Sequence, residues 1–254
     1  MPKLIIILSG KKQSGKSSTA KYIASKVANY KFGTTRFKLN NRGDLLDFSN
    51  KINIDYPCTN AQKFWNEYGL KLYSFADPLK HFCMNVFGLT NNQCYGVAEE
   101  KNSHTHLKWE DQFDDVRLKY SKMRKDKKIW PKGYMTAREV LEVVGTDWCR
   151  RVDINCWAQG TYNIINNENY DLAIICDARF PNEISIGTEI GAMAIRLTRE
   201  IEKSKSAPET ALDNFPMGEY HCVINNNGLT LRQKNKEIDK QIIPWLERYG
   251  ILCK

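Results

Sequence analysis

Residues 4–17 read LIIILSGKKQSGKS, a short apolar run that leads directly into a glycine-rich turn. The run Leu4–Leu8 contains only leucine and isoleucine, which is typical of a strand buried on both faces. Residues 17–28 then carry apolar side chains at helical spacing. A strand, a glycine-rich turn and a helix in this order predict the opening unit of an α/β domain with a parallel sheet.

The turn Gly10–Ser17 matches the phosphate-binding pattern G-x-x-x-x-G-K-[ST] in full. Gly10 and Gly15 allow backbone N–H groups to turn toward phosphate oxygens, and the following helix adds its positive dipole end. Lys16 would reach the β- and γ-phosphates of ATP, and the Ser17 hydroxyl would bind Mg²⁺. The alternative, a glycine turn beside an exposed lysine, does not account for the flanking strand and helix. The residues expected to bind ATP here are Gly10, Lys11, Gln13, Ser14, Gly15, Lys16, Ser17 and Ser18.

Short apolar runs alternate with amphipathic segments along the rest of the chain. Strands are expected at 70–76, 172–176, 192–197 and 222–224, and helices at 78–87, from 137, at 153–166 and at 231–249. This alternation predicts a three-layer α/β/α fold with a parallel five-stranded sheet. We interpret the chain as a single domain over residues 1–254, with polar, irregular insertions at about 31–70 and 90–134.

The composition sets limits on location and partners. Lysines and arginines exceed acidic residues by 38 − 29 = 9, which suits a polyanionic ligand, although a solvated basic surface would give the same excess. The eight cysteines form no CxxC pair and no zinc pattern with the four histidines, which is typical of a reducing compartment. No apolar run reaches the roughly 18 residues of a membrane helix, and we expect no signal peptide. A cytoplasmic location is therefore expected.

Two further segments place charged residues at predicted strand ends, where ligands of parallel sheets bind. Asp77, Pro78 and Lys80 lie at a strand-to-helix junction, so that Lys80 could hold an acceptor phosphate. The alternative is an ordinary capped helix. Asp177 follows a buried strand, the place of a carboxylate linked to Mg²⁺, and Arg179 could make a bidentate contact with phosphate. The alternative for this pair is a salt bridge within a loop.

A third segment surrounds one predicted helix. Thr136 and Glu139 have the spacing of a capping box, with Arg138 between them and Arg150 near the helix end. Trp148 and Trp157 could stack on a nucleotide base. For an isolated tryptophan, however, a place in the core is the more common role.

Together these motifs resemble the deoxynucleoside monophosphate kinases of large bacteriophages and related viruses, relatives of adenylate kinase. The segments that carry the resemblance span most of the chain in one order. They are 9–16 (SGKKQSGK), 75–80 (FADPLK), 138–147 (REVLEVVGTD), 177–183 (DARFPNE) and 223–228 (VINNNG). The resemblance implies an adenylate-kinase-like P-loop fold, ATP and Mg²⁺ as cofactors, and a lid over about 199–218.

The resemblance also implies roles for individual residues. Arg199 looks like the lid arginine that closes over ATP, and Asn226 and Gly228 would lie beside the adenine ring. The catalytic residues would be Lys12, Lys16, Arg179 and Arg199, and the metal ligands Ser17 and Asp177. The acceptor site is expected at Lys12, Leu79, Lys80, Arg138, Gly145, Trp148, Arg150, Trp157, Asp177 and Arg179.

The sequence departs from the family pattern at the donor site. Gln13 stands where the family often has arginine, and Ser17 where it often has aspartate. Ser17 is closer to the general P-loop pattern, so Mg²⁺ binding remains expected. Gln13 removes one positive charge, for which Lys11 could compensate. The segment 31–70 is longer and more polar than the family leads us to expect.

The function implied is ATP-dependent phosphorylation of deoxynucleoside 5′-monophosphates to diphosphates. Animal-type phosphomevalonate kinases share the P-loop style and the segment 211–215 (ALDNF), and they are a rival within the same class. A nucleic-acid-binding P-loop protein is a rival from another class, suggested by the +9 charge and by the basic stretch Arg117–Lys132 with Trp130. A regulatory nucleotide switch is a third alternative, without a guanine-reading motif to support it. We expect small-molecule nucleotides as partners, rather than a membrane or a nucleic acid. The accepted bases, the sugar and a homodimeric state are left open.

Overall fold

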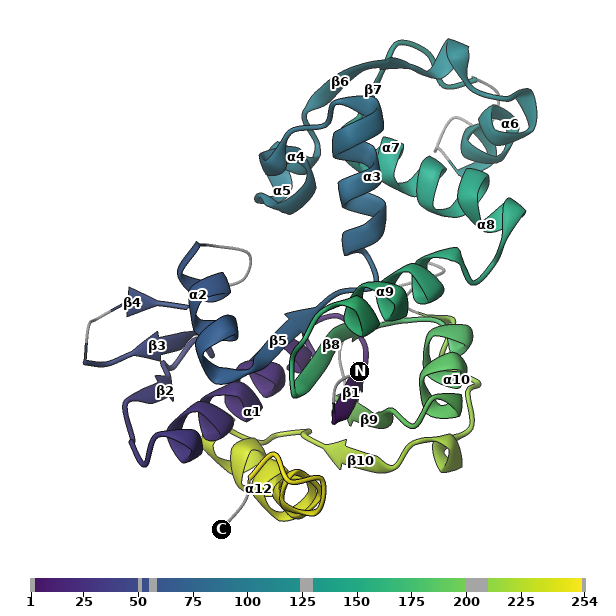
Figure 1. Cartoon of the computed structure of the whole chain (residues 1–254). Helices are drawn as coiled ribbons and strands as arrows, with labels where there is room; N and C mark the ends of the chain where they lie inside the picture. The colour runs from purple at the N-terminus through teal and green to yellow at the C-terminus, as the bar shows by residue number, and fades with distance from the viewer. Residues whose placement is uncertain (1–2, 50–51, 55–58, 124–129, 200–209, 253–254) are drawn as a thin grey trace. The chain divides into compact units, whose positions relative to one another are not determined.

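The computed structural model describes residues 3–49, 52–54, 59–123, 130–199 and 210–252. The chain forms two compact units, one made of residues 1–75 and 158–254 and one made of residues 76–157 (Figure 1). In the sequence, the second unit is thus one continuous stretch inserted between the two segments of the first unit. It contains the predicted insertion 90–134. A single kinase domain over residues 1–254 stays a prediction.

The first unit is built on a five-stranded parallel sheet in the order β10-β9-β1-β8-β5. Its strands are β1 (Leu4–Ser9), β5 (Leu70–Tyr73), β8 (Leu172–Ala178), β9 (Met193–Thr198) and β10 (Cys222–Asn225). The parallel sheet predicted from the sequence is therefore confirmed, with strand ends that differ by one to three residues. β8 runs on to Ala178 because its register with β1 shifts and Ala178 pairs with Ser9.

Helices cover both faces of this sheet, as expected for an α/β/α sandwich. On one face, α1 (Lys16–Lys31), α2 (Thr59–Tyr68) and α12 (Leu231–Arg248) enclose a core that includes Ile6 and Leu8. On the other face, α9 (Cys156–Asn167) and α10 (Pro181–Glu189) enclose a core that includes Ile5 and Ile7. The alternate side chains of β1 thus enter different cores, which explains its uninterrupted apolar sequence.

The helix α9 begins three residues later than the predicted start at Asp153. The backbone carbonyl of Asp153 accepts a hydrogen bond from the Cys156 N–H at 3.2 Å, and its carboxylate accepts one from the Asn155 N–H at 2.8 Å. Asp153 therefore forms a local turn ahead of the helix, a common role for aspartate.

The sequence suggested that the segment 31–70 is irregular, but the structure shows regular elements in it. It contains the three-stranded antiparallel sheet β2 (Phe37–Leu39), β3 (Leu45–Asp47) and β4 (Ile52–Asn53), followed by α2. The carbonyl oxygen of the Asn40 side chain accepts hydrogen bonds from the N–H groups of Arg42 and Asp44, each at 2.9 Å, and so fixes the turn between β2 and β3. Strands of two or three residues are too short to show a periodic pattern.

The second unit is mostly helical, with a two-stranded antiparallel ribbon. Its elements are α3 (Asp77–Phe87), α4 (Asn91–Tyr95), α5 (Ala98–Lys101), β6 (His104–Lys108), η1 (Trp109–Asp111), α6 (Asp114–Met123), β7 (Tyr134–Thr136), α7 (Ala137–Glu142), η2 (Val143–Trp148) and α8 (Cys149–Val152). The core includes the fully buried side chains of Trp109, Cys83 and Val116. The predicted end of α3 at Gly88 is confirmed, because this glycine caps the helix at φ 65°.

The predicted capping box of α7 is also confirmed. The Thr136 hydroxyl accepts a hydrogen bond from the Glu139 N–H at 3.2 Å, and the Glu139 carboxylate accepts one from the Thr136 N–H at 2.9 Å. The helix then widens into the π-helical segment η2, a deviation that occurs frequently at functional sites.

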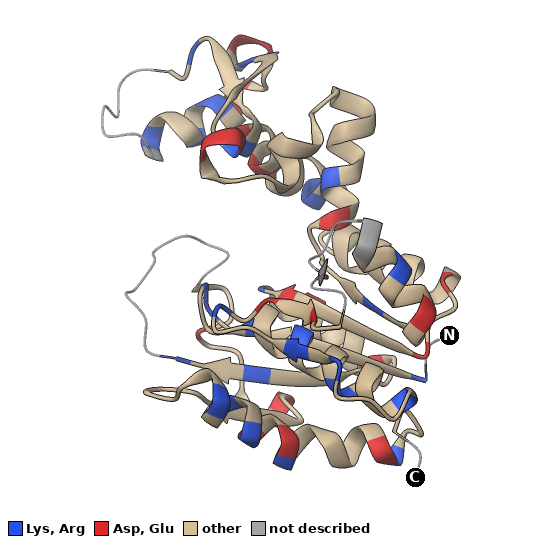
Figure 2. Cartoon of the chain, turned by 90° about the vertical axis from the view of Figure 1, so that its left-hand side faces the viewer, with Lys and Arg blue, Asp and Glu red and all other residues tan. Residues whose placement is uncertain are grey.

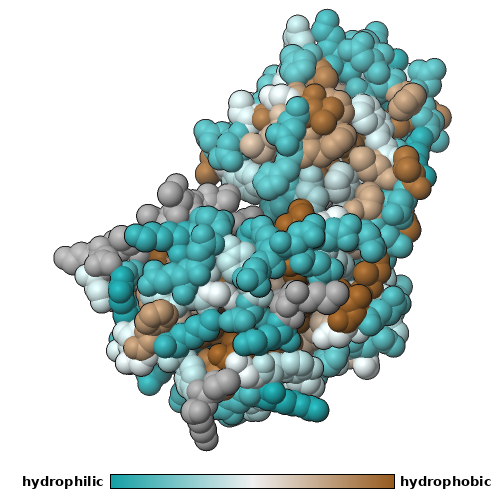
Figure 3. Space-filling model, viewed as in Figure 1, coloured by the Kyte–Doolittle hydropathy of each residue, from teal (hydrophilic) through white to brown (hydrophobic). Residues whose placement is uncertain are grey.

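The surface of the first unit seen in Figure 3 is mostly hydrophilic, with hydrophobic side chains in small groups. Within the described residues, no helix combines the length and the apolar character that a membrane span would need.

Gly187 of α10 provides a test of the packing between α10, α9 and the central strand. A Cβ atom at this position would lie 2.2 Å from the Tyr162 hydroxyl and 2.3 Å from Ile7 Cδ1. We expect Gly187→Ala to lower the free energy of unfolding by about 1–2 kcal/mol, even though alanine is the better helix former. Urea unfolding measures the change. Gly218→Ala is the matched control, since a Cβ there would meet no described atom within 4 Å, and it should alter stability by less than about 0.5 kcal/mol. Equal stability of the two variants would contradict the described packing.

Candidate functional site

The glycine-rich turn between β1 and α1 has an unusual backbone conformation. Gly10, Gln13 and Gly15 have φ angles of 151°, 64° and 91°. Gln13 is the only non-glycine residue with positive φ in the described parts of the chain. Non-glycine residues in this region are uncommon and cluster at ligand sites, and turns of this kind form anion-binding concavities. The backbone of the turn therefore suits a phosphate group.

Lys16 lies over this turn with only 9% of its surface exposed. Its Nζ donates hydrogen bonds to the carbonyl oxygens of Gly10 at 2.5 Å and Lys11 at 2.7 Å. A Cβ atom on Gly10 would lie 2.4 Å from Ser14 Oγ and 2.6 Å from the Leu197 carbonyl oxygen, so only glycine fits there. The Ser17 hydroxyl, one residue further along α1, lies on an exposed residue and is thus accessible to a metal ion.

Asn226 connects the loop after β10 to the same turn. Its side-chain amide donates a hydrogen bond to the Ser14 carbonyl oxygen at 2.7 Å, and the residue is 4% exposed. Asn226 Oδ1 and Ser14 Oγ are buried, with no hydrogen-bond partner among the described residues. Buried polar atoms without partners are costly, and a bound ligand is one explanation for them. The structure thus brings Asn226 to the turn, whereas Gly228 lies exposed at φ 65° two residues on.

Lys234 of α12 is a cation of this site that the sequence reasoning missed. Its Nζ donates hydrogen bonds to Ser18 Oγ at 2.7 Å and to the Gly15 carbonyl oxygen at 3.4 Å. Only 3% of the residue is exposed, and it forms no ion pair within the described residues. Burial, together with the nearby charge of Arg199, lowers the pKa of Lys234 to about 8. The signal was in the sequence, since Lys234 occupies the buried stripe of α12 that continues through Ile238, Ile242 and Leu246.

Arg196 of β9 is a second missed cation. It is 6% exposed, its Nη1 donates a hydrogen bond to Ser9 Oγ at 2.9 Å, and its guanidinium lies 5.8 Å from the ring centre of Tyr220. The Nε atom is buried, and it has no hydrogen-bond partner in the parts of the chain that the structure describes. An arginine inside an apolar strand run, here Met193–Leu197, is the corresponding sequence signal. Arg196 pairs in register with Ser9, directly before Gly10.

The end of β8 holds the predicted metal ligand Asp177. Its carboxylate accepts hydrogen bonds from Ser74 Oγ at 2.6 Å and from the Phe75 N–H at 2.7 Å. An ionised carboxylate has further lone pairs, so these bonds leave it able to bind Mg²⁺. The Arg179 N–H donates to the Glu183 carboxylate at 2.8 Å, which fixes the loop between β8 and α10. Metal binding at Asp177 and Ser17 stays a prediction.

The region assigned to a lid is described in part. Lys11 forms an ion pair with Asp213 at 3.0 Å, so its charge is partly offset by a residue of the segment 211–215. Arg199 is exposed directly after β9. Lys12 is exposed on the turn itself. Residues 200–209 of the predicted lid lie outside the described residues.

The second unit brings three cations together near α3. Lys80 Nζ lies 4.2 Å from the ring centre of Tyr95 and 3.9 Å from Asp77 Oδ1. Arg138 is exposed at the start of α7, and its Nε donates to Asn102 Oδ1 at 2.9 Å. Burial and the charges of Lys80 and Arg138 lower the pKa of Lys101. Lys101 is therefore a missed neighbour of two predicted acceptor residues, and no sequence pattern singled it out.

The predicted acceptor residues Leu79, Gly145, Trp148, Arg150 and Trp157 also lie in the second unit, whereas Lys12, Asp177 and Arg179 belong to the first. The Trp157 Nε1–H donates to the Gly145 carbonyl oxygen at 2.9 Å, and a Cβ on Gly145 would lie 2.6 Å from Leu79 Cδ2. Trp148 packs edge-on against Phe87, with ring centres 5.6 Å apart. Arg150 donates through Nη1 to the Ile154 carbonyl oxygen at 3.1 Å. Both tryptophans thus take part in packing, and their contact with a base stays a prediction.

The parallel five-stranded sheet with helices on both faces is that of a P-loop-NTPase-like α/β protein. No known family model matches the chain. The chain is similar to a protein of Acanthamoeba polyphaga mimivirus that is provisionally named a deoxynucleotide monophosphate kinase. The two are 26% identical over 167 residues, which cover 61% of this chain and 74% of the mimivirus protein.

The burial of Lys234 predicts a distinctive pH dependence of stability. Because its pKa is about 8 when folded and 10.5 when exposed, the unfolded chain binds more protons between these values. The stability contributed by this residue therefore rises with pH through that window. We expect the unfolding free energy of the wild type, minus that of Lys234→Met, to increase by about 3 kcal/mol from pH 8 to 10.5. Chemical unfolding of both proteins across this range measures it, and a flat difference would contradict the burial of the ammonium group.

Proposed function

We propose that the protein is a nucleotide kinase that transfers the γ-phosphoryl group of ATP to deoxynucleoside 5′-monophosphates. The observation that carries this proposal is the turn Gly10–Ser17, where Lys16 and Lys234 lie buried on backbone and hydroxyl oxygens. Positive charge held in this way favours a polyanion over a neutral ligand. The similarity to the mimivirus protein supports a nucleotide as the acceptor.

In this proposal the donor site is the first unit's turn with its surrounding cations. Lys16 would contact the β- and γ-phosphates, and Asn226 and Gly228 would border the adenine ring. Ser17 and Asp177 would hold Mg²⁺, which when bound offsets negative charge on the phosphates. Arg199 would close over the nucleotide with the lid, exclude water and so suppress hydrolysis of ATP.

The acceptor's 5′-phosphate would be bound by Lys12, Lys80, Arg138 and Arg179. One oxygen of that phosphate is already anionic near neutral pH, so the reaction requires no general base. Catalysis would then consist of alignment and of charge stabilisation on the transferred group. Charge stabilisation of this kind would explain why the residues predicted to bind the acceptor phosphate are lysines and arginines.

An acceptor panel tests the proposal. The protein would be incubated with ATP, Mg²⁺ and each deoxynucleoside monophosphate, with 5-phosphomevalonate as the rival acceptor, and ADP release compared with a no-acceptor control. We expect stimulation by one or more of the nucleotides. Stimulation by phosphomevalonate alone would mean that the acceptor is phosphomevalonate and not a nucleotide. An absence of stimulation by every acceptor would contradict a kinase function.

Lys16→Ala tests the donor site. The variant removes the charge that would stabilise the transferred phosphoryl group, so we expect kcat to fall by about 100-fold or more. Steady-state ADP release measures the change, and a thermal unfolding curve shows whether the fold is kept. Lys240→Ala is the control, because that side chain is 70% exposed and pairs with Glu237 on the same helix. Retained turnover in Lys16→Ala would exclude this turn as the donor site.

Lys80→Ala and Arg138→Ala test the acceptor site. Each removes one charge that would bind the acceptor phosphate, so we expect the KM for the monophosphate to rise about 10-fold while the KM for ATP stays within about 2-fold. Lys132→Ala, at an exposed position of the same unit, should leave both constants unchanged. A rise in the KM for ATP with no change for the acceptor would reverse the assignment.

A further inference from the structure

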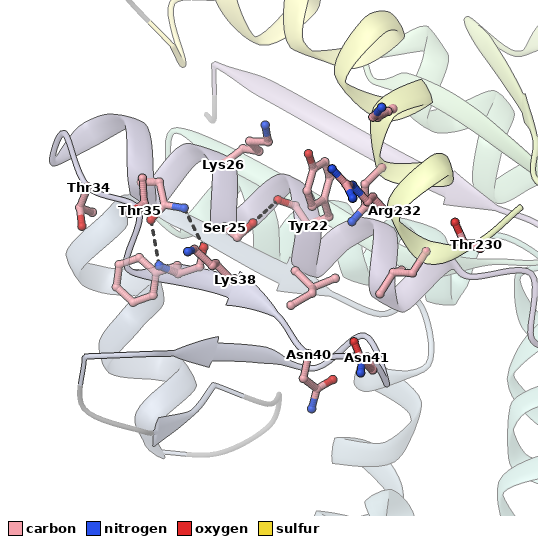
Figure 4. A pocket seen from close by; sticks show the side chains of 16 residues that line it. Tyr22, Ser25, Lys26, Thr34, Thr35, Lys38, Asn40, Asn41, Thr230 and Arg232 are labelled. Atoms are coloured by element: carbon pink, nitrogen blue, oxygen red, sulfur yellow. Dashed lines mark hydrogen bonds between the residues drawn. The ribbon is translucent and has the colours of Figure 1, made fainter.

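A pocket lined by basic residues lies in the first unit, beside the middle of α1. This cavity of about 840 Å³, here called the α1–α12 pocket, is lined by α1, by β2 and the turn after it, and by the first turns of α12 (Figure 4). Its size is within the range of pockets that enclose small ligands. None of the residues assigned to the donor site lines it.

The charged residues that line the pocket are basic. Lys26, Lys38, Arg232 and Lys236 line it, and no aspartate or glutamate is among its described lining residues. Lys26 pairs with Asp239 at 3.1 Å, and Asp239 lines an adjoining hollow. The other three cations form no ion pair in the described parts of the chain. Figure 2 shows the resulting cluster of basic residues in the first turns of α12.

Two of these cations repel each other on the same helix. Arg232 and Lys236 are four residues apart on α12, so their like charges face each other across one turn. Lys38 comes from β2 and adds a third charge to the same pocket (Figure 4). Three such charges without carboxylates are matched by an anion with several negative groups, such as a diphosphate or triphosphate chain.

The pocket also offers a surface for a planar ring. Its apolar lining includes Phe37, Leu39 and Leu231, next to the ring of Tyr22. The Tyr22 hydroxyl is held by the Asp239 carboxylate at 2.8 Å, which fixes this ring in place. The exposed side chains of Thr35 and Asn41 supply hydrogen-bonding groups at the rim. Apolar contact with a few polar groups is typical of sites for small organic ligands.

We propose that the α1–α12 pocket is a second nucleotide site, which binds a nucleoside di- or triphosphate separately from the Gly10–Ser17 turn. A polyphosphate chain would lie among Lys38, Arg232 and Lys236, and the base would lie against the apolar lining. A volume of about 840 Å³ matches one small ligand better than a nucleic acid strand, which binds along an extended groove.

The pocket is formed by elements that also contact the donor site. Lys234, between Arg232 and Lys236 in the sequence, is buried on another side of α12 and donates to Ser18 of α1 at 2.7 Å. The turn after β2 packs on the same residue, since a Cβ on Gly43 would lie 2.8 Å from Ser18 Cβ. A ligand in the pocket therefore contacts three segments that meet at the first turn of α1.

Equilibrium binding to the full-length chain tests this site without relying on catalysis. The probes are ATP, the four deoxynucleoside triphosphates, inorganic tripolyphosphate and a single-stranded oligonucleotide, each titrated by calorimetry into wild type and the double variant Arg232→Glu with Lys236→Glu. We expect the double variant to bind one equivalent fewer of at least one nucleotide than the wild type. The control Lys240→Glu with Arg248→Glu makes the same charge change further along α12 and should keep the wild-type stoichiometry.

Circular dichroism and thermal unfolding show whether the double variant is folded, and Arg232→Gln with Lys236→Gln serves in its place if it is not. Equal stoichiometry in wild type and the variant would overturn the proposal. Equally tight binding of tripolyphosphate, or loss of oligonucleotide binding alone, would overturn the assignment to a nucleotide. The number of bound nucleotides does not depend on phosphoryl transfer. In the Lys16→Ala background, mutating the pocket should therefore still remove one bound equivalent. A failed acceptor panel would leave this result unaffected.

Discussion

Three positively charged side chains are buried around the turn Gly10–Ser17, and the arrangement of the site follows from them. Lys16, Lys234 and Arg196 are each more than nine-tenths buried, beside Gly10, Gly15 and Ser9. Their described hydrogen bonds are to carbonyl and hydroxyl oxygens. Burying a charge in this way is costly, and a polyanionic ligand offsets the cost when it binds. The sheet, the helix starts and the Asn226 loop all hold these cations in place.

The sequence predicted the parts of this arrangement that depend on local patterns. The apolar run of β1, the phosphate-binding turn and the capping box at Thr136 each have a fixed spacing, and the structure confirms the sheet and the cap. The small sheet β2–β4 was missed because its strands are too short for periodicity and are separated by polar turn residues such as Asn40.

The missed cations show a different limit. Lys234 comes to the turn from α12 and Arg196 from β9, both far along the chain, and only tertiary packing brings them there. A charged residue in an otherwise apolar stripe or strand was nevertheless a readable signal at both positions. Lys101 had no such signal, because its relation to Lys80 and Arg138 arises from the packing of short helices in the second unit. The predicted roles of the acceptor residues depend on a ligand, and neither the pattern nor the fold supplies one.

In the proposed reaction, the terminal phosphate of ATP moves to a nucleoside monophosphate and not to water. ³¹P NMR of the protein with ATP, Mg²⁺ and a deoxynucleoside monophosphate follows donor, acceptor and products in one sample. We expect ADP and a deoxynucleoside diphosphate to appear in equal amounts, with little inorganic phosphate. ADP and inorganic phosphate in equal amounts, or unchanged spectra with all four monophosphates, would contradict it.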